Sequence, residues 1–372
     1  MSKLLFVVHP IEKFGPKSGG AISIICYNLL STDSDSEVIA LSHSQERFIN
    51  PRVNYVKLDN LWSRLICRMF YSVMHLPYGG HVSFLLSVAV RILKKRETHV
   101  VCFNDSWFVV YLAYIFPQCN FFVWYQNEPR DVKGLKLASK CSNVKFLSCS
   151  DWVGIQLSHS LGEKTSLKCT TVRSGAVHQL VSQLHRQSNE VSLLYVGRLD
   201  PNKGVDIAIE TLKLLVSRSI CCNLTVVGDT WFYEGGKTAD DEYKKELHKM
   251  AMGSPITFTG HIPHQEITNY YAKADYLLVP SRVPEPAGLV AIEGMVNGCN
   301  VIGRNLGGLP EYLHGLGTVV ESGDPQDWCD AICDSITAGD LMSSRITRAE
   351  RSKLVYSWKN TRESLNQAMH GG

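Results

Sequence analysis

The sequence predicts an α/β protein built from two doubly wound, Rossmann-like domains. The chain has 372 residues, which is long for a single hydrophobic core and favours two domains. Short apolar runs typical of buried strands alternate with segments whose apolar residues have helical spacing. Several of these strands end in polar or glycine-rich residues. In open parallel sheets, ligands bind beside the carboxyl ends of the strands, so these ends are the candidate binding positions.

Composition is that of an ordinary globular protein, with 45% hydrophobic and 20% charged residues. No apolar run reaches the ~18 residues that a spanning helix needs, and the first apolar run reads as a strand. None of the 12 cysteines lies in a C-x2-C pair. We therefore expect a cytoplasmic protein with reduced thiols and no structural zinc.

Charge is distributed unevenly. Residues 1–188 carry 21 Lys and Arg against 12 Asp and Glu, or +9, whereas residues 189–372 carry 17 against 23, or −6, for a net charge of +3. The basic first half indicates an anionic partner, either a membrane surface or a charged acceptor. No basic patch interleaved with aromatic residues is evident, so nucleic acid is not an expected partner.

The first half of the chain reads as strands and helices in alternation. A strand at 3–8 leads through a loop at 9–20 into a helix at 21–30, which Gly19 and Gly20 open. Such glycines let backbone N–H groups approach an anion, although an ordinary turn would look the same. The further strands that we expect are at 38–41, 53–58, 99–103, 120–124 and 144–148. A polar stretch at 185–190 is the predicted linker.

Residues 61–97 have apolar helical faces flanked by cations. Arg64, Arg68 and the cluster at 94–96, with tryptophan and tyrosine nearby, suit contact with a membrane interface. A solvated helix pair packed on the sheet would have the same pattern, and the sequence leaves both interpretations open.

Polar residues follow the predicted strands of the first half. Asp105, Gln126, Asn127 and Glu128 come directly after two of them and are candidates to contact an acceptor or a sugar. For each carboxylate, capping of the next helix is the competing interpretation.

The second half begins with a strand at 192–196, then a turn carrying Arg198 and Lys203, then a helix from 206. Two fixed cations at a strand end could neutralise a diphosphate. The other strands that we expect are at 224–227, 256–260, 275–279, 301–302 and 317–321. The other helices that we expect are at 242–250, 265–272, 288–295, 325–338 and 349–369. His261 and His264 lack companions for a metal set, so we interpret them as loop histidines and predict no metal site.

The most informative stretch is residues 280–311. Glu285 lies on a strand-to-helix loop, and Glu293 lies about two turns into the following helix. Paired carboxylates at that position suit a polyhydroxylated ligand because they accept hydrogen bonds from vicinal hydroxyls.

With its surrounding prolines and glycines, this stretch resembles the Glu-x7-Glu motif of the retaining, nucleotide-sugar-dependent glycosyltransferases of family 4. The resemblance is strong over roughly 190–360 and mostly topological over 1–185. It implies the GT-B fold, in which two Rossmann-like domains face each other across a cleft. The implied divisions are an acceptor-binding domain at 1–185, a donor-binding domain at 190–348 and, at 349–372, a helix that crosses back to the first domain.

The resemblance also implies residue roles. Arg198 and Lys203 would hold the diphosphate, Glu293 the ribose hydroxyls, and Glu285 the transferring sugar. The other implied donor-site residues are Gly19, Gly20, Ile262, Gly288 and Leu289, with Gly307, Gly308 and Glu311 shaping the adjacent loop. Gln126 occupies a position where many members carry a histidine that contacts the donor sugar, and this departure argues against a mechanism that needs an imidazole there.

We therefore expect a retaining, metal-independent hexosyl- or N-acetylhexosaminyltransferase without a cofactor, with a UDP-sugar favoured over a GDP-sugar as donor. The acceptor would be a glycan or lipid-linked sugar of bacterial lipopolysaccharide, O-antigen or capsule assembly, reached at the cytoplasmic membrane face. The alternatives are a nucleotide-sugar 2-epimerase of the same fold and a non-catalytic sugar-nucleotide-binding relative. A dehydrogenase is disfavoured because no Gly-x-Gly-x-x-Gly follows a strand.

Overall fold

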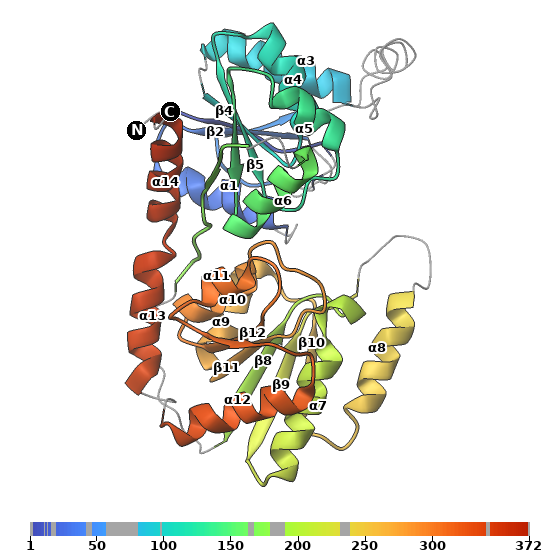
Figure 1. Ribbon diagram of the computed structural model, residues 1–372. Coiled ribbons are helices and arrows are strands. Elements are labelled where there is room, and N and C mark those ends of the chain that lie inside the picture. Colours follow the sequence, from blue (N-terminus) through green and yellow to red (C-terminus); the bar gives the residue numbers. More distant parts are fainter. Residues whose placement is uncertain are drawn as a thin grey trace. The chain divides into compact units, whose positions relative to one another are not determined.

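The computed structural model describes residues 3–10, 12, 14–15, 20–41, 47–56, 81–96, 99–162, 167–178, 190–230, 239–339 and 343–370. The chain forms two compact units (Figure 1). The first domain comprises residues 1–174 and 358–372, and the second comprises residues 175–357. The resemblance implied that the first domain ends at 185 and that the helix crossing back to it begins at 349. Gly19, most of the predicted linker and all of residues 61–80, with Arg64 and Arg68, lie outside the described residues.

The first domain contains a seven-stranded sheet in the order β3-β2-β1-β4-β5-β6-β7, with all its paired strands parallel. Its strands are β1 (Leu5–Val7), β2 (Glu37–Leu41), β3 (Val53–Val56), β4 (His99–Phe103), β5 (Asn120–Tyr125), β6 (Val144–Ser148) and β7 (Cys169–Thr171). Apart from Glu37 and Asn120 at their starts, strands β1, β2 and β5 are apolar, because helices cover both faces of a parallel sheet.

The helices of the first domain are α1 (Ala21–Thr32), α3 (His81–Lys95), α4 (Ser106–Ile115), α5 (Val132–Ala138), α6 (Asp151–Leu161) and α14 (Trp358–His370). Ile25 and Leu29 of α1 and Leu365 of α14 belong to the same buried cluster as the strand residues Phe6 and Trp124. The C-terminal helix α14 is therefore part of the first domain's core.

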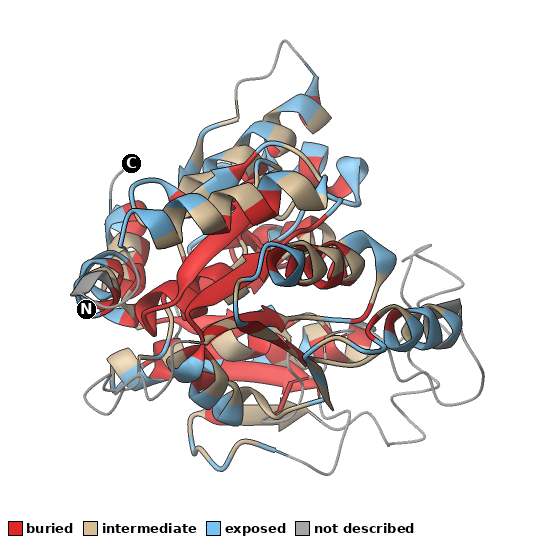
Figure 2. Cartoon of the chain, turned by 90° about the horizontal axis from the view of Figure 1, so that it is seen from below, coloured by how far each residue is buried: buried red, intermediate tan, exposed pale blue. Residues whose placement is uncertain are grey.

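The second domain contains a six-stranded sheet in the order β10-β9-β8-β11-β12-β13. Its strands are β8 (Val191–Val196), β9 (Cys222–Val227), β10 (Ile256–Gly260), β11 (Tyr276–Val279), β12 (Asn300–Arg304) and β13 (Thr318–Val320). Its helices are η1 (Pro201–Lys203), α7 (Val205–Ser217), α8 (Ala239–Met250), α9 (His264–Lys273), α10 (Leu289–Val296), α11 (Leu309–Leu313), α12 (Pro325–Thr337) and α13 (Ser343–Val355). The strands are mostly buried, and most of the exposed residues lie on helices and loops (Figure 2).

Both sheets reverse their strand order at one point. In the first sheet, β1 and β4 are neighbours, with β2 and β3 on one side and β5 to β7 on the other. In the second, β8 and β11 are neighbours in the same way. At such a switch point the connections leave toward opposite sides and open a crevice beside the carboxyl ends of the two strands. The loops after β1, β4, β8 and β11 are therefore the positions where each domain is built to hold a ligand.

The predicted helix at 349–369 is wrong in one respect, because the structure has two helices there. α13 ends at Val355 and α14 begins at Trp358. The carbonyl of Tyr356 accepts a hydrogen bond from the N–H of Ala176 at 3.0 Å, and the Tyr356 hydroxyl donates to the carbonyl of Tyr312 at 2.7 Å. These tertiary contacts hold Tyr356 in the second domain and interrupt the helix, which periodicity alone does not show.

Among the described residues, no helix is both long enough and apolar enough to cross a bilayer. On α3, the side chains of Leu86, Val90 and Leu93 are exposed, and Phe84 and Val88 are buried. The last turn of α3 carries Lys94 and Lys95.

Candidate functional site

The turn after β8 is held against the loop after β11. Gly204 ends η1 with φ of +71°, and a Cβ atom there would lie 2.1 Å from the carbonyl oxygen of Pro280. Only glycine fits this left-handed position at such close approach. The N–H of Arg282 donates to the carbonyl of Asn202 at 2.7 Å, which joins the two segments a second time. This close approach brings Lys203 to the start of the 280–288 loop.

Lys203 and Glu285 form an ion pair across the switch point of the second sheet. The Lys203 Nζ lies 2.6 Å from Glu285 Oε1, and the Ser281 hydroxyl donates to the same oxygen. The two side chains are 25% and 14% exposed, so the pair is partly shielded from water and still open to a ligand. The structure thus joins two residues that the sequence placed in separate motifs.

Glu285 is also fixed through its backbone. It forms a parallel bridge with Gly307, and its carbonyl accepts a hydrogen bond from the N–H of Gly308 at 2.7 Å. Gly307 has φ of +68°, and a Cβ atom there would lie 2.4 Å from the Glu285 carbonyl oxygen. The backbone of Gly307 and Gly308 therefore fixes the position of Glu285 and of its carboxylate.

Replacement of Gly307 by alanine is expected to destabilise the second domain by clearly more than the about 1–2 kcal/mol that a left-handed backbone costs a non-glycine residue, because a clash with Glu285 is added. Gly315→Ala is the matched control, since Gly315 has φ of +70° with open space around its Cβ position. Urea unfolding of both variants measures the difference. Equal losses of stability would show that the contact between Gly307 and Glu285 is not tight.

Two residues that the sequence analysis missed also fasten this site. The Arg282 guanidinium donates to Asp206 Oδ1 at 2.8 Å and to the carbonyl of Pro201 at 2.7 Å. Burial alone would raise the pKa of Asp206, but its hydrogen bonds with Arg282 and Tyr243 lower it below the ordinary value. Asp206 is therefore held as a carboxylate that anchors the loop carrying Glu285.

Glu293 lies in the middle of α10 and is 8% exposed. Its Oε1 lies 2.6 Å from His264 Nε2, and its Oε2 accepts a hydrogen bond from the Tyr271 hydroxyl at 2.9 Å. His264 is thus not a plain loop histidine, as we had expected, but the first residue of α9 and a partner of Glu293. Burial opposes a charged ring, yet the Glu293 carboxylate raises the pKa of His264 above its ordinary value. The pair orients one carboxylate oxygen, which keeps further lone pairs for a ligand.

The stability of the second domain is expected to fall as the pH rises from about 6 to about 8. The folded-state pKa of His264 is raised, so its favourable contribution is complete below the unfolded-state pKa and is lost as the pH rises through the folded-state pKa. In Glu293→Gln this fall should be smaller, whereas His261→Gln, at an exposed neighbouring histidine, should retain it. Melting temperatures across this range provide the measurement. An identical pH dependence in Glu293→Gln and in the unmodified protein would contradict the assignment.

Four of the other predicted donor-site residues are placed as follows. Gly288 is the N-cap of α10 with φ of +74°, and Leu289 begins the helix. The free N–H groups and the dipole at a helix start favour anions. Arg198 follows β8, is 43% exposed, and has Nη1 3.5 Å from Asp200 Oδ2. Ile262 is half-buried directly after β10.

Two further residues of the predicted donor site lie at the starts of helices. Glu311 lies in the first turn of α11. Gly20 has an extended backbone, with φ of −76° and open space around its Cβ position, so the structure does not require glycine there.

In the first domain, Asp105 caps a helix and also pairs with another side chain, and its contact with an acceptor or sugar stays a prediction. It is the N-cap of α4, accepting from the N–H of Phe108 at 3.0 Å, and its Oδ2 lies 3.0 Å from His9 Nε2. Gln126 is 7% exposed, and its backbone N–H donates a hydrogen bond to Asn104 Oδ1 at 2.7 Å. Asn127 and Glu128 are exposed. His9, after β1, was not among the predicted site residues.

Known proteins provide an independent comparison. Residues 179–352 match the family model of the group 1 glycosyl transferases. Over these residues, just under half of the chain, the sequence is similar to the group 1 glycosyl transferases. The match covers the carboxyl edge of the second sheet, including the Lys203–Glu285 pair and Glu293.

Relatives extend the comparison to the first domain. A Salmonella typhimurium protein named lipopolysaccharide 1,2-N-acetylglucosaminetransferase is 23% identical over 381 residues, covering 99% of this chain and 98% of that protein. Among solved structures, Anabaena HepE in complex with UDP has a TM-score of 0.74 at 17% identity, covering 100% of both chains. The apo form of the lipopolysaccharide outer core galactosyltransferase WaaB has a TM-score of 0.65 at 14% identity, covering 99% of each. The chain has the GT-B fold, with two Rossmann-like domains.

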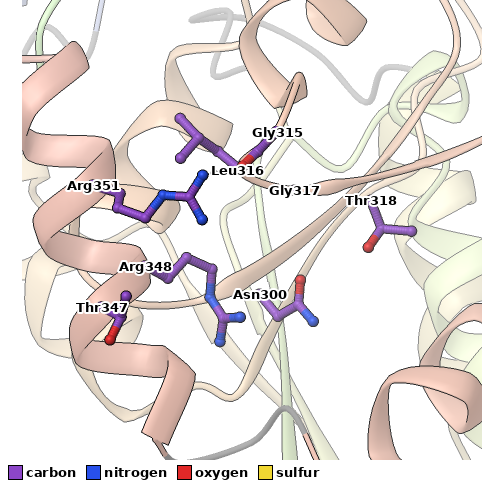
Figure 3. A pocket seen from close by; sticks show the side chains of 8 residues that line it. All are labelled: Asn300, Gly315, Leu316, Gly317, Thr318, Thr347, Arg348 and Arg351. Atoms are coloured by element: carbon purple, nitrogen blue, oxygen red, sulfur yellow. Dashed lines mark hydrogen bonds between the residues drawn. The ribbon is translucent and has the colours of Figure 1, made fainter. Parts of the chain in front are cut away.

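The second domain also contains a cavity of about 250 Å³ away from the Lys203–Glu285 pair. It lies at the amino-terminal ends of β12 and β13, the opposite edge of the sheet, and the side chains of Arg348 and Arg351 extend from α13 toward it (Figure 3). The residues that line it are Asn300, Gly315, Leu316, Gly317, Thr318, Thr347, Arg348 and Arg351. No group of three or more histidine, cysteine or acidic side chains suited to a metal ion occurs in the described part of the chain.

Proposed function

We propose that this group 1 glycosyl transferase moves a hexose or N-acetylhexosamine from a nucleotide-diphosphate sugar to a glycan or lipid-linked acceptor, with retention of the anomeric configuration. The observation that carries the proposal is the Lys203–Glu285 ion pair at the switch point of the second sheet, on the loop that leads into α10 and its Glu293. It unites a cation for a phosphate with carboxylates for sugar hydroxyls in one place.

Each donor-site residue has a proposed role that follows from its chemistry. Lys203 and Arg198 neutralise the diphosphate as the bond from the sugar C1 to its oxygen breaks, in place of a metal ion. Glu285 accepts hydrogen bonds from hydroxyls of the transferring sugar and stabilises the positive charge that develops on its ring. Glu293 binds the ribose hydroxyls. The acceptor oxygen forms the new bond to C1, and its proton passes to the departing diphosphate.

Lys203 has two roles in this scheme, because it binds the diphosphate and also forms an ion pair with Glu285 in the absence of a ligand. A bound diphosphate would draw part of its charge away from Glu285. The carboxylate would then be more available to the cationic sugar ring at the moment when the leaving group departs. The pair therefore couples departure of the diphosphate to stabilisation of the sugar.

A UDP-sugar is the proposed donor, and bacterial lipopolysaccharide, O-antigen or capsule assembly is the proposed pathway. Support comes from the UDP complex of Anabaena HepE and from the names of the Salmonella relative and of WaaB. Asp105, Gln126, Asn127 and Glu128 are the proposed acceptor or sugar contacts in the first domain. Work at the cytoplasmic membrane face is part of the same proposal, with the exposed apolar residues and terminal lysines of α3 as its proposed contact.

Turnover provides the test. The protein is incubated with core oligosaccharide from rough lipopolysaccharide and, separately, UDP-glucose, UDP-galactose, UDP-N-acetylglucosamine or GDP-mannose. We expect one UDP-sugar to yield UDP and an acceptor heavier by one sugar, with the anomeric configuration of the donor by NMR. The Lys213→Met variant should keep full activity, because Lys213 Nζ lies 2.7 Å from Glu210 Oε1 in an ion pair on the surface of α7. An epimerised free UDP-sugar as the product, or an inverted linkage, would contradict the proposal.

A further inference from the structure

We propose that the cavity at the amino-terminal edge of the second sheet is a separate binding site, and that it takes a small phosphate ester carrying free hydroxyl groups. In this assignment, Arg348 and Arg351 hold the phosphate group, and Asn300 accepts a hydrogen bond from a hydroxyl group of the same molecule. The ligand is neither the donor nor the acceptor of the proposed transfer reaction, so the inference stands apart from that function.

The length of a strand separates this cavity from the donor edge. Asn300 lines the cavity and begins β12, whereas Arg304 ends that strand. At a rise of about 3.3 Å per residue, the two ends of β12 lie about 13 Å apart. The parallel strands all run from the cavity edge toward the edge where Lys203 and Glu285 meet. A small molecule in the cavity therefore does not reach the Lys203–Glu285 pair.

Two arginines of α13 give the cavity a positive charge. Arg348 and Arg351 are three residues apart, which makes them neighbours on the helix surface that repel each other, and both extend toward the cavity (Figure 3). None of the described residues that line the cavity is acidic. Arg351 Nη2 donates to the carbonyl of Gly315 at 3.4 Å, and no carboxylate in the described part of the chain pairs with it. A phosphate group bound by both guanidinium groups would offset this repulsion.

Arg345, one turn earlier on α13, shows by contrast what a structural arginine of this helix does. It is buried, its guanidinium donates to two backbone carbonyls of α9, and its Nη1 lies 3.8 Å from Asp275 Oδ1. Arg351 is exposed, and its hydrogen bond to a loop carbonyl is long. The guanidinium of Arg351 is therefore available to a ligand, whereas that of Arg345 is not.

Asn300 brings a buried polar group to the same cavity. It is 6% exposed, and its Nδ2 donates to the Ser335 hydroxyl at 2.9 Å. Its Oδ1 has no hydrogen-bond partner among the residues that the structure describes. A buried acceptor without a partner costs free energy, and a ligand hydroxyl that donates to it removes the cost. The Thr318 hydroxyl, which can donate or accept, lines the cavity beside it.

Size and chemistry together select the class of ligand. A volume of about 250 Å³ lies just below the ~300–1,000 Å³ of most small-molecule sites, so a whole nucleotide-sugar is too large. A neutral sugar would leave the two arginines without a counter-charge, and a bare phosphate ion would leave most of the cavity empty. A phosphorylated sugar or a glycerol phosphate satisfies both the arginines and Asn300.

The test is isothermal titration calorimetry with glucose 6-phosphate, glycerol 3-phosphate, inorganic phosphate and glucose. We expect at least one of the two phosphate esters to bind, and to bind more tightly than inorganic phosphate or glucose. Arg351→Gln should weaken this binding about tenfold, the worth of one hydrogen bond to a charged group. Lys353→Gln removes the same charge from an exposed position of α13 outside the cavity and should leave binding unchanged.

A further variant separates the cavity from the donor edge. Lys203→Met should retain binding of the phosphate ester, because Lys203 lies at the opposite edge of the sheet. Loss of binding in Lys203→Met with full binding in Arg351→Gln would place the phosphate at the donor edge and overturn the inference.

Three other results would also overturn it. They are the absence of binding by both phosphate esters, equal affinity in Arg351→Gln and the unmodified protein, and inorganic phosphate that binds as tightly as both esters. Because Arg351 is exposed and contacts a carbonyl only at 3.4 Å, we expect its replacement to leave the fold intact. The melting temperature of the ligand-free variant checks this.

Discussion

Lys203→Met is expected to lower the rate of sugar transfer by about 10²–10³-fold, the usual effect of removing one group that stabilises developing charge in an active site. The lysine bonds to Glu285 at 2.6 Å and reaches the switch point from η1, so methionine removes the charge while keeping most of the side-chain volume. The initial rate of UDP release at saturating donor measures the effect.

The same substitution should also change the environment of Glu285. Without Lys203, the carboxylate keeps Ser281 as a hydrogen-bond donor but loses its ion pair. Lys244→Met is the matched control, because Lys244 Nζ lies 2.6 Å from Asp229 Oδ1 and is exposed to a similar extent. A rate for Lys203→Met within a fewfold of that for Lys244→Met would contradict the role assigned to Lys203.

Asp33→Ala is expected to destabilise the first domain by about 3–5 kcal/mol, the range measured when one partner of a buried ion pair is removed. Asp33 follows α1, and its Oδ2 lies 2.9 Å from Arg362 Nε of α14, with side-chain exposures of 7% for Asp33 and 1% for Arg362. Burial lowers the pKa of Arg362, and Asp33 opposes that effect. Removal of the carboxylate leaves a buried guanidinium without its counter-charge and loosens the attachment of α14.

Lys359→Ala is the control for this prediction. Lys359 lies on the same helix, is 77% exposed, and has Nζ 3.9 Å from Glu363 Oε1. An exposed pair of this spacing contributes only about 0.3–0.5 kcal/mol. Urea unfolding of both variants gives the comparison. A loss below about 1 kcal/mol for Asp33→Ala would mean that the buried pair is not what fastens α14.

The α/β architecture with two parallel sheets was predictable because its signal is local. Apolar runs such as those of β5, β8 and β11 are each followed by polar or glycine residues, and this pattern marks a buried parallel strand whatever its neighbours are. The break between α13 and α14 was not predictable, because a contact of Tyr356 with a distant segment decides it.

The candidate site divides in the same way. Lys203, Glu285 and Glu293 could be named from motifs, but their partners could not. His264 is bonded to Glu293, Arg282 to Asp206, and His9 to Asp105, and in each case the partner lies on another strand end or helix. The order of the strands in the sheet determines which of these side chains come into contact, and a single sequence does not reveal that order. One feature of the sequence could have identified His9, because it is a titratable residue that follows the first strand.

The measurement that tests the central claim most directly is the thermal shift of the protein with UDP, compared between the unmodified chain and Glu293→Ala. A ligand at ~100 times its dissociation constant adds about 2.7 kcal/mol of stability. We predict a clear rise in melting temperature with UDP that is lost in Glu293→Ala and retained in Lys244→Met. A rise of equal size in Glu293→Ala, or no rise in the unmodified protein, would contradict the assignment of this edge of the second sheet as the donor site.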